Sequence, residues 1–419
     1  MSDWETRPLG SLVNFQKGRK VDTSAYPGIG YERYLGAGAL SGRSDDYAST
    51  HLAVQANESD VLMLWDGERS GLVSTGLSGV VSSTVCKLTP HETISSRLLY
   101  YYLAHSFEWI QNRRTGTGVP HVPKDLGKIL KIAFPLDRSA QQRITNVLQT
   151  IDQAIEHTTT LIDKYQQIKA GLMHDLFTRG IGTDGQLRPP REQAPELYQQ
   201  TPVGWIPVDW IFSSCEKVCE KIIDCKNRTP PVTADGFPVI RTPNVRHGIF
   251  VDDELVYTDH DSYLMWTARG KPQPGDIVIT REAPVGEVCK IPDRHQQSCL
   301  GQRMMLYRTD PARVHSDYLL YALQSARIQN RLDLISGGST VGHVRVGDIR
   351  NLWIYSPAEL DEQKKIAALL NAACGKIESE VVKLHKLQKQ KAGLMHDLLT
   401  GKVPVTVDTV TKEAADVQN

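Results

Sequence analysis

The amino-acid sequence predicts an α+β protein in which two globular domains alternate with two long helices. One ten-residue segment occurs twice, as KAGLMHDLFT at 169–178 and as KAGLMHDLLT at 391–400. Around each copy, apolar residues recur at alternating spacings of four and three, which is typical of helices that pack in coiled-coil style. Short apolar runs bounded by turn residues, which indicate strands, occur outside these two stretches. The sequence therefore predicts an internal repeat of two like halves, each a globular domain followed by a long helix.

The order of the segments follows from the repeat and from the composition between its copies. Residues 61–65 and 276–280 are predicted strands, whereas 97–112 and 316–330 have helical spacing. Residues 179–204 are rich in Gly, Pro and Gln, which favours a linker. In chain order we expect a globular domain at 1–138, a long helix at 139–180, a linker at 181–204, a second globular domain at 205–358, a second long helix at 359–402 and a disordered tail at 403–419.

The two long helices carry most of the repeat. With an offset of 222 residues, 16 of the 40 positions in 139–178 are identical in the second copy. Pro135 and Pro357 precede the helices, and Gly180 and Gly401 follow them, as start and stop signals predict. The predicted seam residues are Ile144, Leu148, Ile151, Ile155, Ile162, Tyr165, Leu172 and Leu176 in the first helix and Ile366, Leu370, Ile377, Leu384, Leu387, Leu394 and Leu398 in the second. Polar residues take equivalent seam positions, Thr158 with Glu380 and Lys169 with Lys391.

Composition limits the class of protein. A chain of 419 residues is expected to form two or three domains. Lys and Arg number 48 and Asp and Glu 48, so the formal net charge is zero, which argues against gripping nucleic acid by bulk charge alone. We see no apolar run long enough for a membrane helix and no apolar signal segment at the N-terminus, so we expect a cytoplasmic protein. Seven cysteines, an odd number, do not indicate a disulfide framework.

Motifs for catalysis are absent or weak. No phosphate-binding loop of the G-x-x-x-x-G-K-[ST] type occurs, and the cysteines lack the paired spacing of a zinc site. The repeated segment contains His174-Asp175 and His396-Asp397, which leave a metal-dependent hydrolase as one hypothesis. Adjacent residues on a helix point about 100° apart, so neither pair makes a natural bidentate site. We therefore predict no catalytic and no metal-binding residues in this chain.

Polar and cationic residues beside Gly and Pro suggest recognition loops in both domains. Arg pairs well with guanine, Asn and Gln with adenine, and Lys, Ser and Thr with phosphate. A Thr- or Ser-rich segment ending in His occurs at the same place in both halves, shortly before each long helix. The predicted DNA-binding residues are Lys17, Arg19, Lys20, Trp65, Asp66, Arg69, Thr115, Thr117 and His121 in the first domain and Lys226, Asn227, Arg228, Arg241, Asn244, Arg246, Arg281, Glu282, Ser339, Thr340 and His343 in the second.

Taken together, these features resemble the DNA-specificity subunit of type I restriction–modification systems over nearly the whole chain. The resemblance is carried by the two globular halves and the duplicated helix ending in KAGLMHDL. It is also carried by four short motifs: QQRI at 141–144, EQKKI at 362–366, GDIVITRE at 275–282 and VGWIP at 203–207. Each short motif is weak alone, whereas their order and duplication are specific.

The resemblance implies a fold and a set of partners. The globular halves would be target-recognition domains that each read one half of a bipartite, asymmetric sequence in double-stranded DNA. The helices would form an antiparallel coiled-coil pair related by a pseudo-two-fold axis, act as a spacer and dock two methyltransferase (modification) subunits. Restriction subunits would join that core. The chain itself would hold no cofactor and be non-catalytic, with S-adenosylmethionine, ATP and Mg²⁺ bound by the partners for adenine methylation and cleavage. A coiled-coil protein-interaction scaffold is the second alternative, beside the hydrolase.

Overall fold

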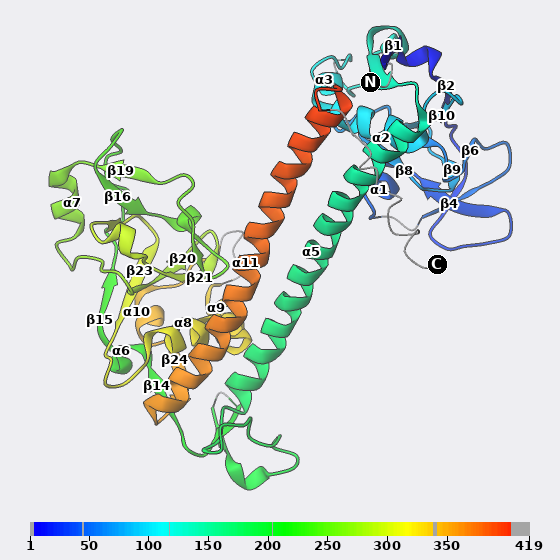
Figure 1. Cartoon of the computed structure of the whole chain (residues 1–419). Helices are drawn as coiled ribbons and strands as arrows, with labels where there is room; N and C mark the ends of the chain where they lie inside the picture. Colours follow the sequence, from blue (N-terminus) through cyan, green and yellow to red (C-terminus); the bar gives the residue numbers. More distant parts are fainter. Residues whose placement is uncertain (1–3, 44–45, 117, 203, 338–341, 404–419) are drawn as a thin grey trace, which may run out of the picture. The chain divides into compact units, whose positions relative to one another are not determined.

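The structure is a computed structural model, and it consists of two compact units. It describes residues 4–43, 46–116, 118–202, 204–337 and 342–403. Unit 1 contains Met1–Thr160 and Val381–Asn419, and unit 2 contains Leu161–Glu380. Two long helices, α5 (Arg138–Thr178) and α11 (Leu360–Leu399), each contribute one part to each unit (Figure 1).

Unit 1 is built around an antiparallel sheet of four strands. These are, in spatial order, β2 (Val13–Lys17), β10 (Val85–Pro90), β7 (Val61–Leu64) and β8 (Val73–Thr75). A five-stranded sheet adds β3 (Thr23–Ser24), β5 (Tyr47–Ser49), β4 (Tyr31–Leu35), β9 (Gly79–Val81) and β6 (Gln55–Ala56). The remaining elements are the strand pair β1 (Trp4–Pro8) with β11 (Lys131–Pro135) and the helices α1 (Ala37–Leu40), α2 (Ser96–His105), α3 (Phe107–Gln111) and α4 (Leu126–Ile129).

Unit 2 repeats this plan. Its four-stranded antiparallel sheet runs in the order β15 (Cys219–Asp224), β23 (Met304–Thr309), β20 (Ile277–Arg281) and β21 (Val285–Lys290). The smaller sheets are β19 (Val256–Thr258) with β16 (Phe237–Ile240) and β22 (Cys299–Leu300), β14 (Trp210–Ser214) with β24 (Trp353–Pro357), and β17 (Val245–Arg246) with β18 (Ile249–Phe250). The helices are α6 (Cys215–Val218), α7 (His260–Trp266), α8 (Ser316–Gln324), α9 (Ala326–Ile335) and α10 (Val346–Arg350).

In each four-stranded sheet the third strand in spatial order, β7 in unit 1 and β20 in unit 2, is buried on both faces. In β7, Val61 and Met63 enter one apolar cluster while Leu62 enters another on the opposite face. In β20, Ile277 and Val278 divide between two clusters in the same way. Because successive side chains of a strand point to opposite faces, a sheet covered on both sides needs apolar residues at every position. This explains the uninterrupted apolar runs at 61–64 and 277–279.

The long helices are part of the cores of both units. In unit 1 the beginning of α5, with Ile144 and Leu148, packs in the same cluster as the end of α11, with Leu398. In unit 2 the end of α5, with Leu176, shares a cluster with the beginning of α11, with Ile366 and Leu370. All fifteen predicted seam residues are buried or half-buried.

A buried glutamine joins each long helix to its domain. Gln141 donates to Pro135 O and Thr93 O, both at 2.9 Å, and accepts from Ser95 N at 2.9 Å. Gln363 repeats this pattern with Pro357 O at 2.9 Å, Arg313 O at 3.4 Å and His315 N at 2.8 Å. The two glutamines are 1% and 0% exposed, so the duplicated residue closes the same loop in both halves.

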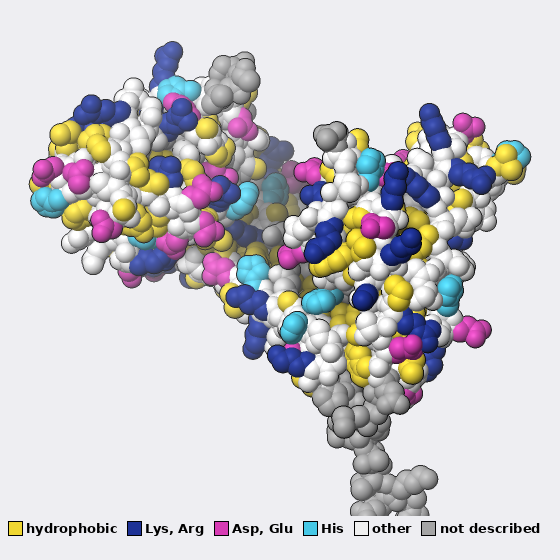
Figure 2. All heavy atoms as spheres, turned by 90° about the horizontal axis from the view of Figure 1, so that it is seen from above, with side chains coloured by type: hydrophobic (Ala, Val, Ile, Leu, Met, Phe, Trp, Pro, Cys, Tyr) yellow, Lys and Arg dark blue, Asp and Glu magenta, His cyan; other side chains and the backbone are white. Residues whose placement is uncertain are grey.

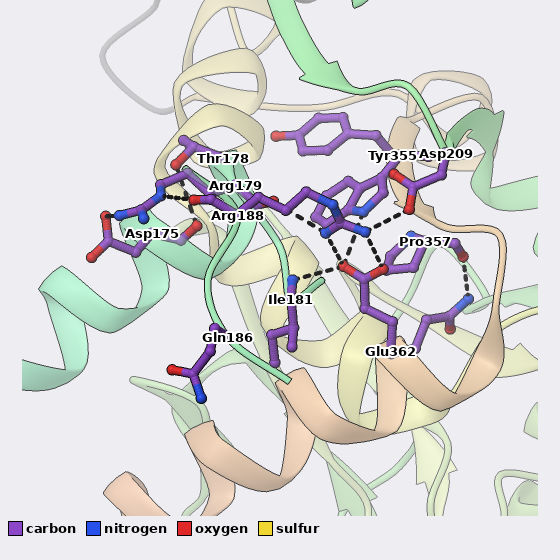
Figure 3. A network of polar contacts seen from close by, with 12 residues as sticks. Asp175, Thr178, Arg179, Ile181, Gln186, Arg188, Asp209, Tyr355, Pro357 and Glu362 are labelled. Atoms are coloured by element: carbon purple, nitrogen blue, oxygen red, sulfur yellow. Dashed lines mark hydrogen bonds and ion pairs between the residues drawn. The ribbon is translucent and has the colours of Figure 1, made fainter. Parts of the chain in front are cut away.

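The segment expected to be a linker is ordered and packs within unit 2. It contains a hairpin of β12 (Tyr198–Thr201) and β13 (Gly204–Pro207). Arg188 contacts the Glu362 carboxylate through two nitrogens at 2.6 and 2.8 Å and Asp209 at 2.5 Å, while Ile181 N donates to Glu362 at 2.8 Å (Figure 3). The Glu362 carboxylate raises the pKa of Arg188. The Gly and Pro content of this segment correctly indicated turns. It could not indicate the ion pair between Arg188 and Glu362 that holds the segment against unit 2.

Two further predictions concern the C-terminal tail and membrane-spanning helices. The predicted tail at 403–419 lies outside the described residues apart from Val403. Within the described part of the chain, none of the helices combines the length and the apolar character needed to cross a membrane.

Candidate nucleic-acid interface

In unit 1, two predicted residues, Lys17 and His121, contact the carboxylate of a third predicted residue, Asp66. Asp66 lies two residues after the end of β7 and contacts Lys17 Nζ, at the end of β2, through Oδ2 at 2.7 Å. Its other oxygen, Oδ1, lies 2.7 Å from His121 Nδ1. The Asp66 side chain is 15% exposed, while those of Lys17 and His121 are 48% and 45% exposed. We call this arrangement cluster 1.

Unit 2 contains a second arrangement of the same kind. Glu282 Oε1 lies 2.5 Å from His343 Nδ1, and Glu282 Oε2 lies 2.8 Å from Arg303 Nε. The carboxylate is again the least accessible member, at 21% exposed, against 45% for His343 and 44% for Arg303. We call this arrangement cluster 2. Each cluster therefore holds one acid, one histidine and one cation.

The backbone places the two clusters at equivalent points of the fold. Asp66 and His121 form an isolated antiparallel bridge, and so do Glu282 and His343. One residue further along, Val122 N donates to Trp65 O at 2.9 Å, as Val344 N donates to Arg281 O at 3.1 Å. The carboxylate thus follows the central strand of each sheet, and the loop before the last short strand brings the histidine to it. The cation comes from the end of β2 in unit 1 and from the turn just before β23 in unit 2.

The chemistry of the clusters favours contact with a polyanion. Since a carboxylate can only accept, Nδ1 of each imidazole must carry the hydrogen. Nε2 of His121 and of His343 has no hydrogen-bond partner among the described residues. The exposed cation and imidazole can then meet phosphate or a base edge, while the carboxylate holds both in place.

A concave surface adjoins cluster 1. It encloses about 840 Å³ and is lined by Lys17 and Trp65 of this region together with Phe15, Lys124 and Lys128. The Phe15 and Trp65 rings meet edge to face with centroids 6.0 Å apart. In the space-filling view, Lys and Arg side chains of unit 1 surround an area of hydrophobic ones (Figure 2, right). Aromatic rings beside lysines are typical of surfaces that bind nucleic acid. The Cys86 thiol also lines the concavity, and burial raises its pKa to about 11.

Several other predicted residues are exposed cations outside the clusters. Lys226 and Arg228 lie over the Trp266 ring, 4.9 and 5.2 Å from its centroid. Arg69 donates to the Ser41 hydroxyl at 3.2 Å, and Thr115 pairs with His121 through two backbone hydrogen bonds. The remaining predicted residues with accessible side chains are Arg19, Lys20, Asn227 and Arg246. Among the described residues, the ion pairs of Asp66 and Glu282 involve none of these side chains.

Three predicted residues are engaged inside the domain instead. Asn244 is 0% exposed, and its amide is bonded to Arg241 N, Val251 O and Asp253 O. Its side chain therefore stabilises the loop and is not available to DNA. Arg281 is 6% exposed and donates to Val344 O at 3.3 Å. Arg241 donates to Glu254 O at 2.6 Å. Asn244 and Arg281 are therefore buried rather than presented at the surface, because polarity beside Gly and Pro does not distinguish side chains that support a loop from those on its surface.

Three predicted residues, Thr117, Ser339 and Thr340, lie outside the described residues. Sequence reasoning also missed members of the site. Arg303 completes cluster 2 from a left-handed backbone conformation, φ 73°, at the start of β23. Phe15 supports Trp65 from a neighbouring region of the sheet. No local motif marks either residue, because the chain brings them to the site from distant positions.

The aspartates of the repeated His-Asp pairs lie beside cations. Asp175 lies 3.8 Å from Arg179, and Asp397 lies 4.0 Å from Lys402. Over the described ranges, no group of three or more His, Cys, Asp or Glu residues could hold a metal ion. All seven cysteines are free thiols.

Comparison with known proteins gives a consistent result. The model of the type I restriction modification DNA specificity domain matches residues 1–167 and 207–389. The chain is 27% identical over 411 residues to the type I restriction enzyme MjaVIII specificity subunit of Methanocaldococcus jannaschii, covering 96% of this chain and 93% of the relative. It is 25% identical over 285 residues to the putative MjaX specificity subunit of the same organism, covering 66% and 60%.

Solved structures resemble the fold. The S subunit of a type I restriction–modification system from M. genitalium matches with a TM-score of 0.58 and 14% identity, over 97% of both chains. A chain from a structure on complex assembly and conformational transition of the type I R-M system matches with a TM-score of 0.53 and 16% identity. That match covers 96% of this chain and 98% of the other.

Proposed function

Since the chain belongs to the type I restriction–modification DNA specificity family, we propose that it selects the DNA sequence on which a methyltransferase–endonuclease complex acts. Unit 1 and unit 2 would each read one half of a bipartite, asymmetric site in double-stranded DNA. The chain itself would supply recognition and assembly but no catalysis.

The observation that carries this proposal is the equivalence of clusters 1 and 2. The two domains differ in most side chains, yet both place an exposed imidazole and an exposed cation around a less accessible carboxylate at the same point of the sheet. A protein that reads two different half-sites needs a common way to approach the backbone and different side chains to discriminate bases. The two clusters fit a common way to approach the DNA backbone. The surrounding loops, which differ between the units, fit the need for different side chains to discriminate bases.

The proposed partners follow from the family. Two modification subunits would bind S-adenosylmethionine and methylate adenine, and restriction subunits with ATP and Mg²⁺ would join them. The long helices would form an antiparallel coiled-coil spacer and dock the modification subunits. Zero net charge fits this role, because partners that close around the DNA would share the phosphate contacts.

A domain exchange tests the proposal. Residues 1–138 would be replaced by the corresponding domain of another specificity subunit, and adenine methylation would be mapped across the genome with the modification subunit present. We expect one half of the methylated sequence to change and the other half to stay. A methylated sequence that stays unchanged in both halves would contradict recognition by unit 1. A chain that serves only as a protein scaffold predicts the same methylation pattern with and without its gene.

A further inference from the structure

The duplicated decapeptide presents identical residues to solvent in both units. Ala170, Gly171 and His174 are exposed in α5, and the equivalent Ala392, Gly393 and His396 are exposed in α11. The apolar residues of the segment that enter the cores, such as Leu176 and Leu398, are identical for packing reasons. Packing does not require the exposed residues to be the same in the two copies. That they are the same indicates that both copies contact the same kind of partner.

The glycines strengthen this point. A side chain added at Gly171 or Gly393 would meet nothing within 4 Å, and neither residue has a positive φ. A glycine inside a helix costs roughly 0.5–1 kcal/mol relative to alanine. The fold gains nothing from either glycine, whereas a partner that approaches the helix backbone closely would. A third open helical glycine, Gly375, is not repeated, because the first helix has Gln153 there.

In unit 2 the exposed face of the decapeptide forms one wall of a groove. The groove encloses about 590 Å³, and Ala170, Met173 and Phe177 of α5 supply its apolar lining. Residues Gln324 to Arg327, at the junction of α8 and α9, form the opposite side, and Tyr355 of β24 contributes its ring.

One buried polar group beside this groove has no hydrogen-bond partner in the described part of the chain. Tyr355 is 3% exposed, and its hydroxyl has no hydrogen-bond partner in the described part of the chain. The Ser325 hydroxyl, which donates its hydrogen to Ala322 O, lies beside the Tyr355 hydroxyl. Leaving a buried polar group unsatisfied costs about 1–3 kcal/mol, so an acceptor supplied from outside would be stabilised here.

The charge of the groove is of one sign. Its lining includes Lys169, His174 and Arg327 but no aspartate or glutamate. Lys169 lies 5.9 Å from the Tyr321 ring centroid, and Arg327 lies over the Tyr355 ring at 4.6 Å. Neither cation forms an ion pair within the described ranges. A carboxylate would complement these cations and would accept from the Tyr355 hydroxyl.

We propose that this groove binds a segment of the modification subunit that presents a carboxylate between apolar side chains. The inference rests on the proposed function, because the partner is the one named there. The equivalent exposed residues of α11 would take the same segment of a second copy. The carboxylate would accept from Tyr355 and lie close to Arg327, while the apolar side chains would cover Ala170 and Met173.

The test uses the full-length chain and the purified modification subunit of its own system. Sedimentation would give the number of modification subunits bound, and titration would give their affinities. We expect the natural chain to bind two copies. Arg327→Glu and Gly171→Leu should each leave one copy bound normally and weaken the other at least about tenfold. Leucine favours a helix more than glycine does, so Gly171→Leu should not lower the melting temperature.

Matched controls separate docking from folding. Arg331→Glu reverses an exposed charge on α9 outside the groove, and Gly375→Leu fills an equally open helical position that is not repeated. Both should bind two copies with unchanged affinity. If the natural chain and both groove variants bind two copies equally well, the groove inference is wrong while the proposed function stands. If the natural chain binds no modification subunit at all, the proposed function itself fails.

Discussion

Asp66 and Glu282 each position the neighbouring side chains of a site while being less exposed than those side chains. Each carboxylate is shared between a histidine and a cation, and each is less exposed than either partner. A free lysine or imidazole on a surface loop samples many orientations, and ordering it costs conformational entropy. Holding both side chains on one acid reduces that cost before the DNA arrives. The negative charge is at the same time compensated within the protein, so it does not repel phosphate.

Replacing Asp66 by asparagine should therefore weaken recognition of one half-site. Asparagine keeps the shape but loses the charge that holds Lys17, and we expect DNA affinity to fall about 5- to 50-fold. The measurement is titration of labelled DNA with the chain and its modification subunit at fixed salt. Glu92→Gln, an exposed acid in the same unit, should leave the affinity within about twofold. An unchanged affinity for Asp66→Asn would rule out the positioning role.

Single residues also show where sequence reasoning stops. His121 and His343 could be selected because the same loop ends in histidine in both halves, and the structure brings both to a carboxylate. Asn244 has the same polar character and the same Gly and Pro neighbours, yet it is fully buried. Which loop amide faces inward depends on contacts with residues 251 and 253, and no spacing rule contains that information.

His105 should make unit 1 sensitive to acid. Partial burial, with a smaller contribution from His396, lowers the pKa of His105 below its usual 6.5. A histidine with a lowered pKa takes up a proton more readily in the unfolded chain, so stability is complete above about pH 6.5 and declines as the pH falls below it. We expect the melting temperature to drop less between pH 7.5 and 5.5 in His105→Gln than in the natural chain. Equal drops in both proteins would show that other groups cause the acid sensitivity.

At the scale of elements, the long helices were the most predictable feature and the segment between 181 and 204 the least. Alternating spacings of four and three are a local property of the sequence, and they place α5 and α11 within two residues of their predicted starts. The hairpin β12–β13 depends instead on Arg188, which contacts the start of α11 174 positions later in the chain. A local pattern cannot report such a partner. The buried Gln141 and Gln363 are an intermediate case. The repeat shows that the same residue occupies both positions, but it does not predict the hydrogen bonds that the two side chains form.

The contact between Arg188 and Glu362 should be one of the strongest in unit 2. Both side chains are nearly buried, at 10% and 11% exposed, and Glu362 also accepts from Ile181 N and Trp210 Nε1. Removing one partner of such a pair leaves the other charge buried, so Glu362→Gln should lower the free energy of unfolding by about 2–4 kcal/mol. Urea unfolding followed by tryptophan fluorescence measures the loss.

A neighbouring ion pair provides the control for this prediction. Lys364 and Asp361 lie on the same turn of α11 at 3.3 Å, but their side chains are 58% and 86% exposed. Exposed pairs contribute about 0–1 kcal/mol, so Lys364→Met should change the stability little. Similar losses in both variants would mean that burial does not determine the strength of the Arg188 contact.

At the scale of the whole molecule, the internal repeat explains why one fold can serve two recognition tasks. The four-stranded sheets, the two clusters and the glutamine contacts recur in both units, while the remaining loops differ. The beginning of each long helix is buried in one unit and its end in the other. Repetition could be read from the sequence because it is a comparison of the chain with itself. The proposed base contacts could not be read in this way, since they would depend on loops that have no counterpart in the other half.

The proposed spacer role of the helices leads to a prediction about DNA geometry. Deleting residues 159–162 from α5 and the equivalent residues 381–384 from α11 removes about one turn from each helix and shortens it by about 6 Å. DNA rises about 3.4 Å per base pair, so the unread spacer between the half-sites should shorten by about one or two base pairs. Because neither deletion touches a domain, both half-sites should stay the same. Methylation mapping distinguishes the outcomes: altered half-sites with an unchanged spacer would show that the helices do not set the separation.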